Sequence, residues 1–238
     1  MKVAISFIGT GKYLNFLPKW YEQVSENFLP DAEKTFLVFT DGAGDFPEDV
    51  KVYKQEHLDW PYITLKRFEI LQKARDVIKD SDWYVFLDAD LMPVDKITTE
   101  EFFDDSKPYF GVHHPCHFLQ MPPHNQPPGA FDTTTLSKAC VAEGDDLSVY
   151  YQGCLWGGKG EEVSSLISYL ASQVNKDLEL NVIAQWHDES HLNKFFSQNR
   201  DKVNTLHPQY AFPEVFAQYC EFEPKMIHLS KDNSQFHV

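Results

Sequence analysis

The stretch Trp83-Tyr84-Val85-Phe86-Leu87-Asp88-Ala89-Asp90 joins a short apolar run to two carboxylates. Its first five residues are rich in aromatic and aliphatic side chains, which predicts a buried strand. Asp88 and Asp90 then lie at the carboxyl end of that strand, the edge of an open α/β sheet where ligands bind. Adjacent carboxylates repel each other unless a cation lies between them, and Mg²⁺ and Mn²⁺ prefer such oxygen ligands. Alternatively, the two aspartates only cap the next turn.

Strands and helices alternate on both sides of this stretch. The expected strands are Val3–Ile8 and Thr35–Phe39, and the expected helices are Tyr13–Asn27, Leu65–Ile78, Val163–Val174 and Glu189–Phe196. In the first two of these helices, apolar residues recur mostly on one face. Alternation of this kind predicts an α/β fold with a Rossmann-like, mostly parallel central sheet flanked by helices.

Length and composition narrow the class of protein. The chain of 238 residues suffices for one large domain, or two small ones packed together, with a sizeable core. Its formal charge of −15 argues against binding nucleic acid or an anionic membrane through a broad basic face. The four cysteines form no C-x-x-C pair and predict reduced thiols in a cytoplasmic protein. The apolar run within Met1–Phe7 is too short for a signal peptide or a membrane span.

Gly9-Thr10-Gly11-Lys12 follows the first expected strand and superficially suggests a phosphate-binding loop. The full phosphate-loop spacing is missing, and Tyr13 occupies the position where Ser or Thr would hold a metal ion. We therefore predict a tight turn between strand and helix, with Tyr13 available to stack on a base.

The aspartate pair also matches the D-x-D motif of Mg²⁺-dependent aspartate-nucleophile phosphohydrolases. In those enzymes the first Asp attacks phosphorus, the second acts as acid and base, and the motif follows the first strand. Here two expected strands precede the motif, and Leu91-Met92-Pro93 follows it. A phosphohydrolase is therefore the alternative function.

A second dense patch of polar residues runs from Trp186 to Asn193. On a helix, His187 and His191 share a face at the spacing of zinc ligands, although Asp188 replaces the longer Glu of the H-E-x-x-H motif. On the other face, Trp186, Glu189 and Asn193 align, and a carboxylate beside an indole is common in sugar-binding sites. A zinc hydrolase, a non-catalytic sugar-binding module and a plain helix N-terminus all stay open from this patch alone.

Two further segments suggest binding surfaces. Tyr150–Gly158 mixes aromatic residues with three glycines, which let a ligand approach the backbone closely; an ordinary strand with a bulge would look the same. The segment from Pro108 is rich in proline and predicts a long functional loop. That loop also carries four histidines: His113, His114, His117 and His124.

Taken together and in this order, these patches resemble the retaining glycosyltransferases of family six, the family of the histo-blood-group A and B transferases and the α-1,3-galactosyltransferases. The match runs through nearly the whole chain, and Trp186–Lys194 is its most specific part. The matching stretches are Lys12-Tyr13, Val38–Asp41, Trp60–Arg67, Tyr84–Asp90, His114-Pro115, Tyr150–Gly158, Trp186–Lys194 and Lys231.

The resemblance implies one domain with the GT-A fold. Residues 1–107 would be its nucleotide-binding half, and residues 108–238 an acceptor-side half that shares the core and ends in a mobile tail from Ser230. It also implies transfer of galactose, N-acetylgalactosamine or a related hexose from a UDP-sugar to a glycan acceptor in α linkage. The implied cofactor is Mn²⁺, or Mg²⁺.

The resemblance also implies roles for individual residues. Asp88 and Asp90 would carry the metal and the diphosphate, Tyr13 would stack on uracil, and Lys231 would close over the diphosphate. Glu189 resembles the family's candidate nucleophile or oxocarbenium-stabilising carboxylate. The implied donor-binding residues are Ile8, Tyr13, Ile63, Arg67, Asp88, Ala89, Asp90, Asp188 and Lys231, and the acceptor-binding residues are His114, Gln152, Cys154 and Trp186.

The chain departs from the family pattern at several points. We expect it to lack the membrane anchor and stem of the animal members, as the short microbial or viral members do. Many of those short members carry Asn-x-Asn and work without metal, whereas this chain keeps both aspartates. Cys154 replaces a Gly or Ala that governs room for the donor's 2-substituent, so the site leans away from N-acetylgalactosamine. The proline-rich Pro122–Gly129 also departs from the pattern and leaves the acceptor open.

Overall fold

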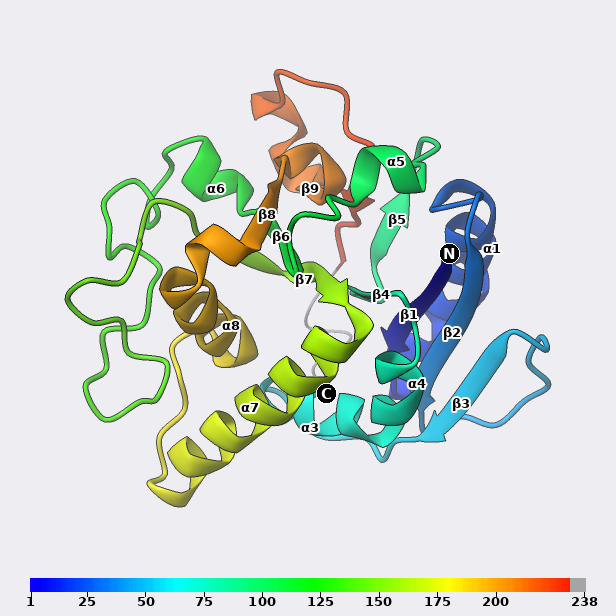
Figure 1. Cartoon of the computed structure of the whole chain (residues 1–238), viewed down its shortest axis with the longest axis horizontal. Coiled ribbons are helices and arrows are strands. Elements are labelled where there is room, and N and C mark those ends of the chain that lie inside the picture. Colours follow the sequence, from blue (N-terminus) through cyan, green and yellow to red (C-terminus); the bar gives the residue numbers. More distant parts are fainter. Residues whose placement is uncertain (232–238) are drawn as a thin grey trace.

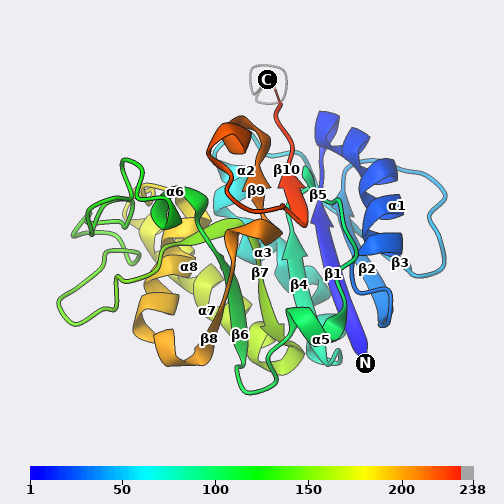
Figure 2. The same ribbon diagram turned by 90° about the horizontal axis from the view of Figure 1, so that it is seen from above.

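We analysed a computed structural model of the chain, which describes residues 1–231. A seven-stranded sheet forms its centre, with the strand order β3-β2-β1-β4-β7-β6-β8 (Figures 1 and 2). These strands are β1 (Lys2–Ile8), β2 (Glu33–Thr40), β3 (Val50–Lys54), β4 (Trp83–Leu87), β6 (Tyr109–His113), β7 (Tyr151–Lys159) and β8 (Val203–Leu206). Strands from both halves of the sequence therefore share one sheet, because β4 pairs with β7.

The sheet is mostly parallel, as the sequence predicts. Only β7 runs against its neighbours, pairing antiparallel with both β4 and β6, while the other pairs are parallel. The stretch Trp83–Leu87 is fully buried and forms β4 with the predicted bounds. Strands β3, β6 and β8 were not predicted, although the first three residues of β3, Val50-Lys51-Val52, alternate between apolar and polar.

The α-helices and the 3₁₀ helices lie around the sheet (Figure 1). The helices are α1 (Leu17–Asn27), α2 (Tyr62–Leu65), α3 (Arg67–Leu71), α4 (Arg75–Lys79), α5 (Thr99–Phe102), α6 (Pro115–Phe118), α7 (Gly160–Glu179) and α8 (His187–Gln198). The 3₁₀ helices are η1 (Gly11–Phe16), η2 (Gln72–Ala74), η3 (Arg200–Lys202), η4 (Pro208–Tyr210) and η5 (Glu214–Tyr219).

Two apolar clusters cover the two faces of the sheet. Alternate residues of β1, β2 and β4 point to opposite faces, as the pleat of a strand requires. On one face they pack against α1 through Trp20 and Val24. On the other they pack against α3, α4, α7 and α8, with Phe68, Trp156 and Ile167 among the buried side chains. The result is three layers, with the sheet in the middle.

Two predicted helices differ from the structure. The segment predicted as a helix from Tyr13 begins as the 3₁₀ helix η1, and α1 starts at Leu17 with Pro18 in its first turn, where a missing N–H costs nothing. The helix predicted over Leu65–Ile78 is broken: Leu65 ends α2, and α3, η2 and α4 follow. Its breaks lie at Lys66 and Ala74, whose ψ angles of 13° leave the α region.

The proline-rich segment is only partly a loop. It begins with β6 and the one-turn helix α6, and residues 119–150 then form turns and irregular chain. Of the tail predicted to be mobile, residues 232–238 lie outside the described part of the chain. Within residues 1–231, none of the helices has both the length and the apolar character needed to span a bilayer.

A second, small sheet has the strand order β5-β10-β9 and lies beside the carboxyl end of β4 (Figure 2). Its strands are β5 (Leu91–Pro93), β9 (Phe212–Pro213) and β10 (Met226–His228). The antiparallel register pairs His228 with Leu91, and Leu229 donates its N–H to the Asp90 carbonyl at 2.9 Å. This register brings the C-terminal segment next to the aspartate pair.

Gly157 marks a close approach of two strands and gives a test of the fold. A Cβ at this position would lie 2.1 Å from the Tyr84 carbonyl oxygen and 2.5 Å from the Phe110 ring. We therefore expect Gly157→Ala to force β4 and β7 apart and to lower the free energy of unfolding by about 3 kcal/mol or more. Guanidinium unfolding measures the change. Gly44→Ala is the control, because its Cβ would meet no atom within 4 Å; equal stability of the two variants would contradict the packing.

Candidate active site

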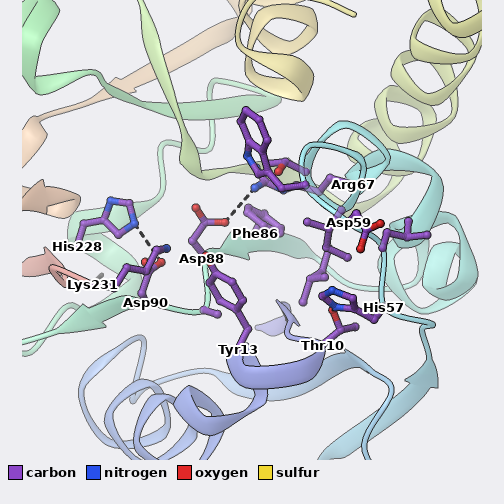
Figure 3. Close-up of a pocket in the computed structure, with 16 residues that line it drawn as sticks. Thr10, Tyr13, His57, Asp59, Arg67, Phe86, Asp88, Asp90, His228 and Lys231 are labelled. Atoms are coloured by element: carbon purple, nitrogen blue, oxygen red, sulfur yellow. Dashed lines mark hydrogen bonds and ion pairs between the residues drawn. The ribbon is translucent and has the colours of Figure 1, made fainter. Parts of the chain in front are cut away.

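A cavity of about 360 Å³ opens at the carboxyl ends of β1 and β4 (Figure 3). Of the nine residues predicted to bind the donor, all but Asp188 line it. Its lining residues are Ile8, Thr10, Tyr13, His57, Leu58, Asp59, Trp60, Ile63, Thr64, Arg67, Phe86, Asp88, Ala89, Asp90, His228 and Lys231. The carboxyl edge of the sheet, where the sequence predicts ligand binding, thus contains a cavity.

A second cavity, of about 270 Å³, adjoins the first. Its lining includes the four residues predicted to bind the acceptor, together with Asp188 and Glu189. The two cavities share Thr64, Arg67, Asp88 and His228. The described residues therefore form two compartments that meet at Arg67 and Asp88.

Asp90 is the most enclosed charged group of the first cavity, with 2% of its side chain exposed. Its Oδ1 accepts a hydrogen bond from His228 Nε2 at 3.0 Å, and its Oδ2 forms an ion pair with Lys231. Burial raises the pKa of Asp90, but the hydrogen bonds and charges of His228 and Lys231 outweigh burial and hold it well below its usual range. Asp90 is therefore a buried, ionised carboxylate, and its negative charge favours cations at this position.

The residues here fit a divalent cation. One ligand atom from each of Asp88, Asp90 and His228 lies within 4.8 Å of the others. Two carboxylates and an imidazole suit Mn²⁺ and related ions, and the opening toward the cavity leaves room for further oxygen ligands. Asp88 lies between Arg67 on one side and Asp90 on the other (Figure 3).

Arg67 connects the two cavities. Its guanidinium forms ion pairs with Asp188 Oδ2 at 2.7 Å and Asp88 Oδ1 at 3.1 Å, and it donates to the Gly153 carbonyl at 2.9 Å. It also lies 4.4 Å from the centre of the Phe86 ring. Burial lowers the pKa of Arg67, but the two carboxylates outweigh burial and raise it. Arg67 is thus a fixed positive charge at the junction of the cavities.

The buried pair of Arg67 and Asp188 gives a prediction on stability. Arg67→Met would leave Asp188, whose side chain is only 3% exposed, without its cation. Removing one partner of a buried pair costs about 3–5 kcal/mol, and we expect a loss of that size in guanidinium unfolding. The neighbouring Lys66→Met is the control, because Lys66 pairs with the half-exposed Glu69 at 3.9 Å and should change stability by less than about 1 kcal/mol. Equal losses in both variants would contradict the proposed role of this network.

Glu189 lies in the second cavity, in the first turn of α8. Its Oε1 accepts a hydrogen bond from Tyr150 Oη and its Oε2 accepts one from the Gly153 N–H, both at 2.7 Å. Burial raises the pKa of Glu189, while the hydrogen bonds from Gly153 and Tyr150 oppose that shift by stabilising the carboxylate. Both oxygens are therefore held in place on the wall of the cavity.

An irregularity in the sheet frees the Gly153 N–H for this contact. In the pairing of β6 with β7, Gly111 lies opposite Trp156 but the next residue, Val112, lies opposite Gln152. The intervening residues of β7 therefore leave the β6 ladder. This is the kind of bulge that the glycines of Tyr150–Gly158 indicate. A Cβ on Gly153 would come within 3.2 Å of Glu189 Oε2, so the glycine also permits the close approach.

The predicted acceptor-binding residues surround the rest of the second cavity. Trp186 is 43% exposed, whereas Gln152 and Cys154 are buried. The Gln152 Oε1 is buried and has no hydrogen-bond partner among residues 1–231. An unpaired buried amide oxygen beside a cavity is a ready acceptor for a ligand hydroxyl.

The zinc pair of His187 and His191, one of the alternatives left open by the sequence, is not formed. His187 has a φ angle of 52° and packs edge-on against Trp60, so it does not share a regular helical face with His191. His191 is buried and its Nε2 lies 3.4 Å from Asp177 Oδ2. Neither histidine belongs to a group of potential metal ligands in the described part of the chain. The structure gives no support to a zinc hydrolase.

The histidines of the loop form a packed cluster. His114, Cys116 and His124 bring potential ligand atoms within 4.8 Å of one another. The rings of His114 and His124 are stacked, however, with centres 4.2 Å apart and planes 22° apart. Imidazole lone pairs lie in the ring plane, so two stacked rings cannot both direct them at one ion. His114 Nδ1 instead accepts a hydrogen bond from the Cys116 N–H.

Sequence reasoning missed several residues of the site. His228 lines both cavities, yet nothing in its local sequence distinguishes it, because its place depends on the pairing of β10 with β5. Thr10 and His57 also line the first cavity and share a hydrogen bond of 3.0 Å. Thr10 lies in the turn after β1, a position that the sheet-edge argument could have indicated.

Comparison with known proteins identifies the family. The family model described as glycosyltransferase family 6 matches residues 1–235. The chain is 28% identical to the O-antigen biosynthesis glycosyltransferase WbnI of Escherichia coli, covering 100% of this chain and 98% of that protein. It is 24% identical to the histo-blood group ABO system transferase 2 of Rattus norvegicus, covering 96% of this chain and 68% of that protein. It is 23% identical to the globoside alpha-1,3-N-acetylgalactosaminyltransferase 1 of Homo sapiens, covering 90% of this chain and 62% of that longer protein.

These matches agree with the fold. The central sheet is the mostly parallel, helix-flanked sheet predicted from the sequence. With a family model that matches nearly the whole chain, the protein belongs to glycosyltransferase family 6, whose members have the GT-A fold.

Proposed function

We propose that the protein transfers a hexose, galactose or N-acetylgalactosamine, from a UDP-sugar to a hydroxyl of a glycan, with retention of the α configuration. The observation that carries this proposal is the pair of adjoining cavities. One contains the two aspartates, the other contains Glu189, and Arg67 belongs to both. Residues 1–107 would supply most of the donor side, and the second half would supply Glu189 and the acceptor side.

The first cavity would bind the UDP moiety. Tyr13 would stack on uracil, with Ile8 and Ile63 as apolar neighbours in the same lining. Asp88 and Asp90 would hold a Mn²⁺ or Mg²⁺ ion that supplies positive charge to the leaving diphosphate. Arg67 would add a second, permanent charge at the sugar end of the diphosphate.

Lys231 would change partners when the donor binds. Its ammonium group now pairs with Asp90 and lies 4.8 Å from the centre of the Tyr13 ring. With the aspartates engaged by a cation, Lys231 would be available to the diphosphate oxygens above Tyr13. Such a contact would order the C-terminal segment over the donor and limit its hydrolysis by water.

Glu189 would act on the anomeric carbon. In the reaction, the bond from this carbon to the UDP oxygen breaks, a bond to the acceptor oxygen forms on the same face, and the acceptor proton leaves with UDP. A carboxylate held by Tyr150 and Gly153 can stabilise the positive charge that develops, or attack the carbon directly. Asp188, ion-paired with Arg67, would contact the donor sugar.

The second cavity would bind the acceptor. The exposed Trp186 offers an apolar surface for a sugar ring, and His114 offers a polar edge in the same lining. The unpaired Gln152 Oε1 would accept a hydrogen bond from a sugar hydroxyl. Cys154 would narrow the space for a large 2-substituent on the donor, which favours galactose over N-acetylgalactosamine.

A panel of UDP-sugars tests the proposal. We expect UDP release from one or two hexose donors, stimulation by added Mn²⁺, loss of release with a chelator, and an α anomer by NMR when a glycan acceptor is included. Hydrolysis of simple phosphomonoesters with no response to UDP-sugars would instead indicate the phosphohydrolase. Binding of glycans with UDP-sugars left intact would indicate a sugar-binding module without catalysis.

A further inference from the structure

His228 is placed against the aspartate pair by the fold itself. Strand β10 pairs antiparallel with β5, and this register puts His228 beside Leu91, the residue directly after Asp90. The Leu229 N–H donates to the Asp90 carbonyl at 2.9 Å and fixes the same register from the backbone. The backbone pairing of β10 with β5 therefore fixes the position of the imidazole beside the aspartates.

The distances match those between neighbouring ligands of one ion. His228 Nε2 lies 3.0 Å from Asp90 Oδ1. Two adjacent ligands of an octahedral ion with bonds of about 2.1 Å lie about 3 Å apart. An oxygen of Asp88 completes the group, with all three ligand atoms within 4.8 Å of one another.

Asp88 can also supply a ligand atom to the ion. Its Oδ1 accepts from Arg67 at 3.1 Å, so its second oxygen can turn toward the ion. In Figure 3, His228 and Asp90 lie together on the side of Asp88 away from Arg67. Three protein ligands on one side of an octahedral ion would leave three positions for diphosphate oxygens and water.

We propose that His228 is a third protein ligand of the metal ion, through Nε2, and that the site is therefore an Asp-Asp-His site rather than a site of two aspartates. This inference rests on the metal-dependent function proposed above and adds a residue that the D-x-D motif does not contain. Ion binding would release the Nε2 proton to solvent, leave the proton on Nδ1, and replace the hydrogen bond to Asp90 with a bond from Nε2 to the metal.

An imidazole ligand changes which ion the site prefers. Carboxylates alone suit Mg²⁺ and Mn²⁺ similarly, whereas imidazole is a softer ligand that suits transition metals. His228 would thus select Mn²⁺ over Mg²⁺. Replacing it with a side chain that offers only oxygen should reduce that selectivity.

Electron paramagnetic resonance of bound Mn²⁺ tests the proposal, with UDP as the nucleotide. In the wild-type protein, electron spin echo modulation should show a ¹⁴N nucleus bonded directly to Mn²⁺. His228→Gln keeps a polar group near Asp90 but removes the ring nitrogen. In that variant the ¹⁴N signal should vanish, and Mn²⁺ affinity should fall by at least the ~10–100-fold that loss of an outer-shell partner costs. The preference for Mn²⁺ over Mg²⁺ should fall with it.

His207→Asn is the matched control. His207 lies outside both cavities, and its Nδ1 accepts a hydrogen bond from the Gln209 N–H that an Asn oxygen can accept as well. This variant should keep the ¹⁴N signal and the Mn²⁺ affinity of the wild type. A ¹⁴N signal that persists in His228→Gln overturns the proposal, and so does UDP-dependent Mn²⁺ binding in the wild type without any ¹⁴N signal. Absence of UDP-dependent Mn²⁺ binding in the wild type would instead overturn the metal-dependent function on which it rests.

Discussion

Glu189→Gln should reduce the turnover of glycosyl transfer by about a hundredfold or more, because one charged partner of the transition state is worth about 3 kcal/mol. The substitution keeps the shape of the side chain. Its amide oxygen can still accept from the Gly153 N–H, and Tyr150 Oη can accept from the new amide instead of donating. The fold and the first cavity should therefore be unchanged.

Two measurements separate lost chemistry from lost binding. Steady-state rates of UDP release should fall, while calorimetric affinity for UDP with Mn²⁺ should equal that of the wild type. Glu161→Gln serves as control, because its side chain is 74% exposed and lies at the start of α7, away from both cavities. Turnover of the Glu189→Gln variant close to that of the wild type would show that this carboxylate does not act on the anomeric carbon.

Asp90→Asn should weaken Mn²⁺-dependent UDP binding strongly and abolish measurable transfer. Asn has nearly the same size but no charge, so it is a poor ligand for a hard cation. It also removes the anion that now holds His228 and Lys231. We expect calorimetry to give similar, weak UDP binding with Mn²⁺ and with a chelator.

The control for this variant is Asp95→Asn, an exposed aspartate five residues along the chain. It should bind UDP as tightly as the wild type and keep its response to Mn²⁺. Circular dichroism and thermal unfolding would confirm that both variants are folded. If Asp90→Asn bound UDP with wild-type affinity and an intact Mn²⁺ response, the aspartate pair would not be the metal site.

Local patterns predicted the centre of the fold and the position of the site. The run Trp83–Leu87 has a strong strand preference and no breaker, so its bounds could be predicted without knowledge of its neighbours. The sheet-edge rule then placed Asp88 and Asp90 at a ligand site, and both line the first cavity.

Features that depend on distant contacts were not predictable in this way. The breaks around α3 leave the apolar periodicity intact, so periodicity alone indicated one continuous helix. His191 fits the spacing of a zinc ligand but is turned toward Asp177 of α7. His228 and the bulge at Gly153 follow from strand pairing between segments far apart in the chain, which no local pattern contains.

The central claim is that a cation held by Asp88 and Asp90 binds the diphosphate so that the anomeric carbon faces Glu189. It is tested most directly by a crystal structure of the Glu189→Gln variant with Mn²⁺ and the UDP-sugar identified by the donor panel. We predict the ion bonded to both aspartates and to the diphosphate, with the anomeric carbon about 3–3.5 Å from the side chain at position 189. A donor bound outside the first cavity, or an anomeric carbon far from position 189, would contradict the account.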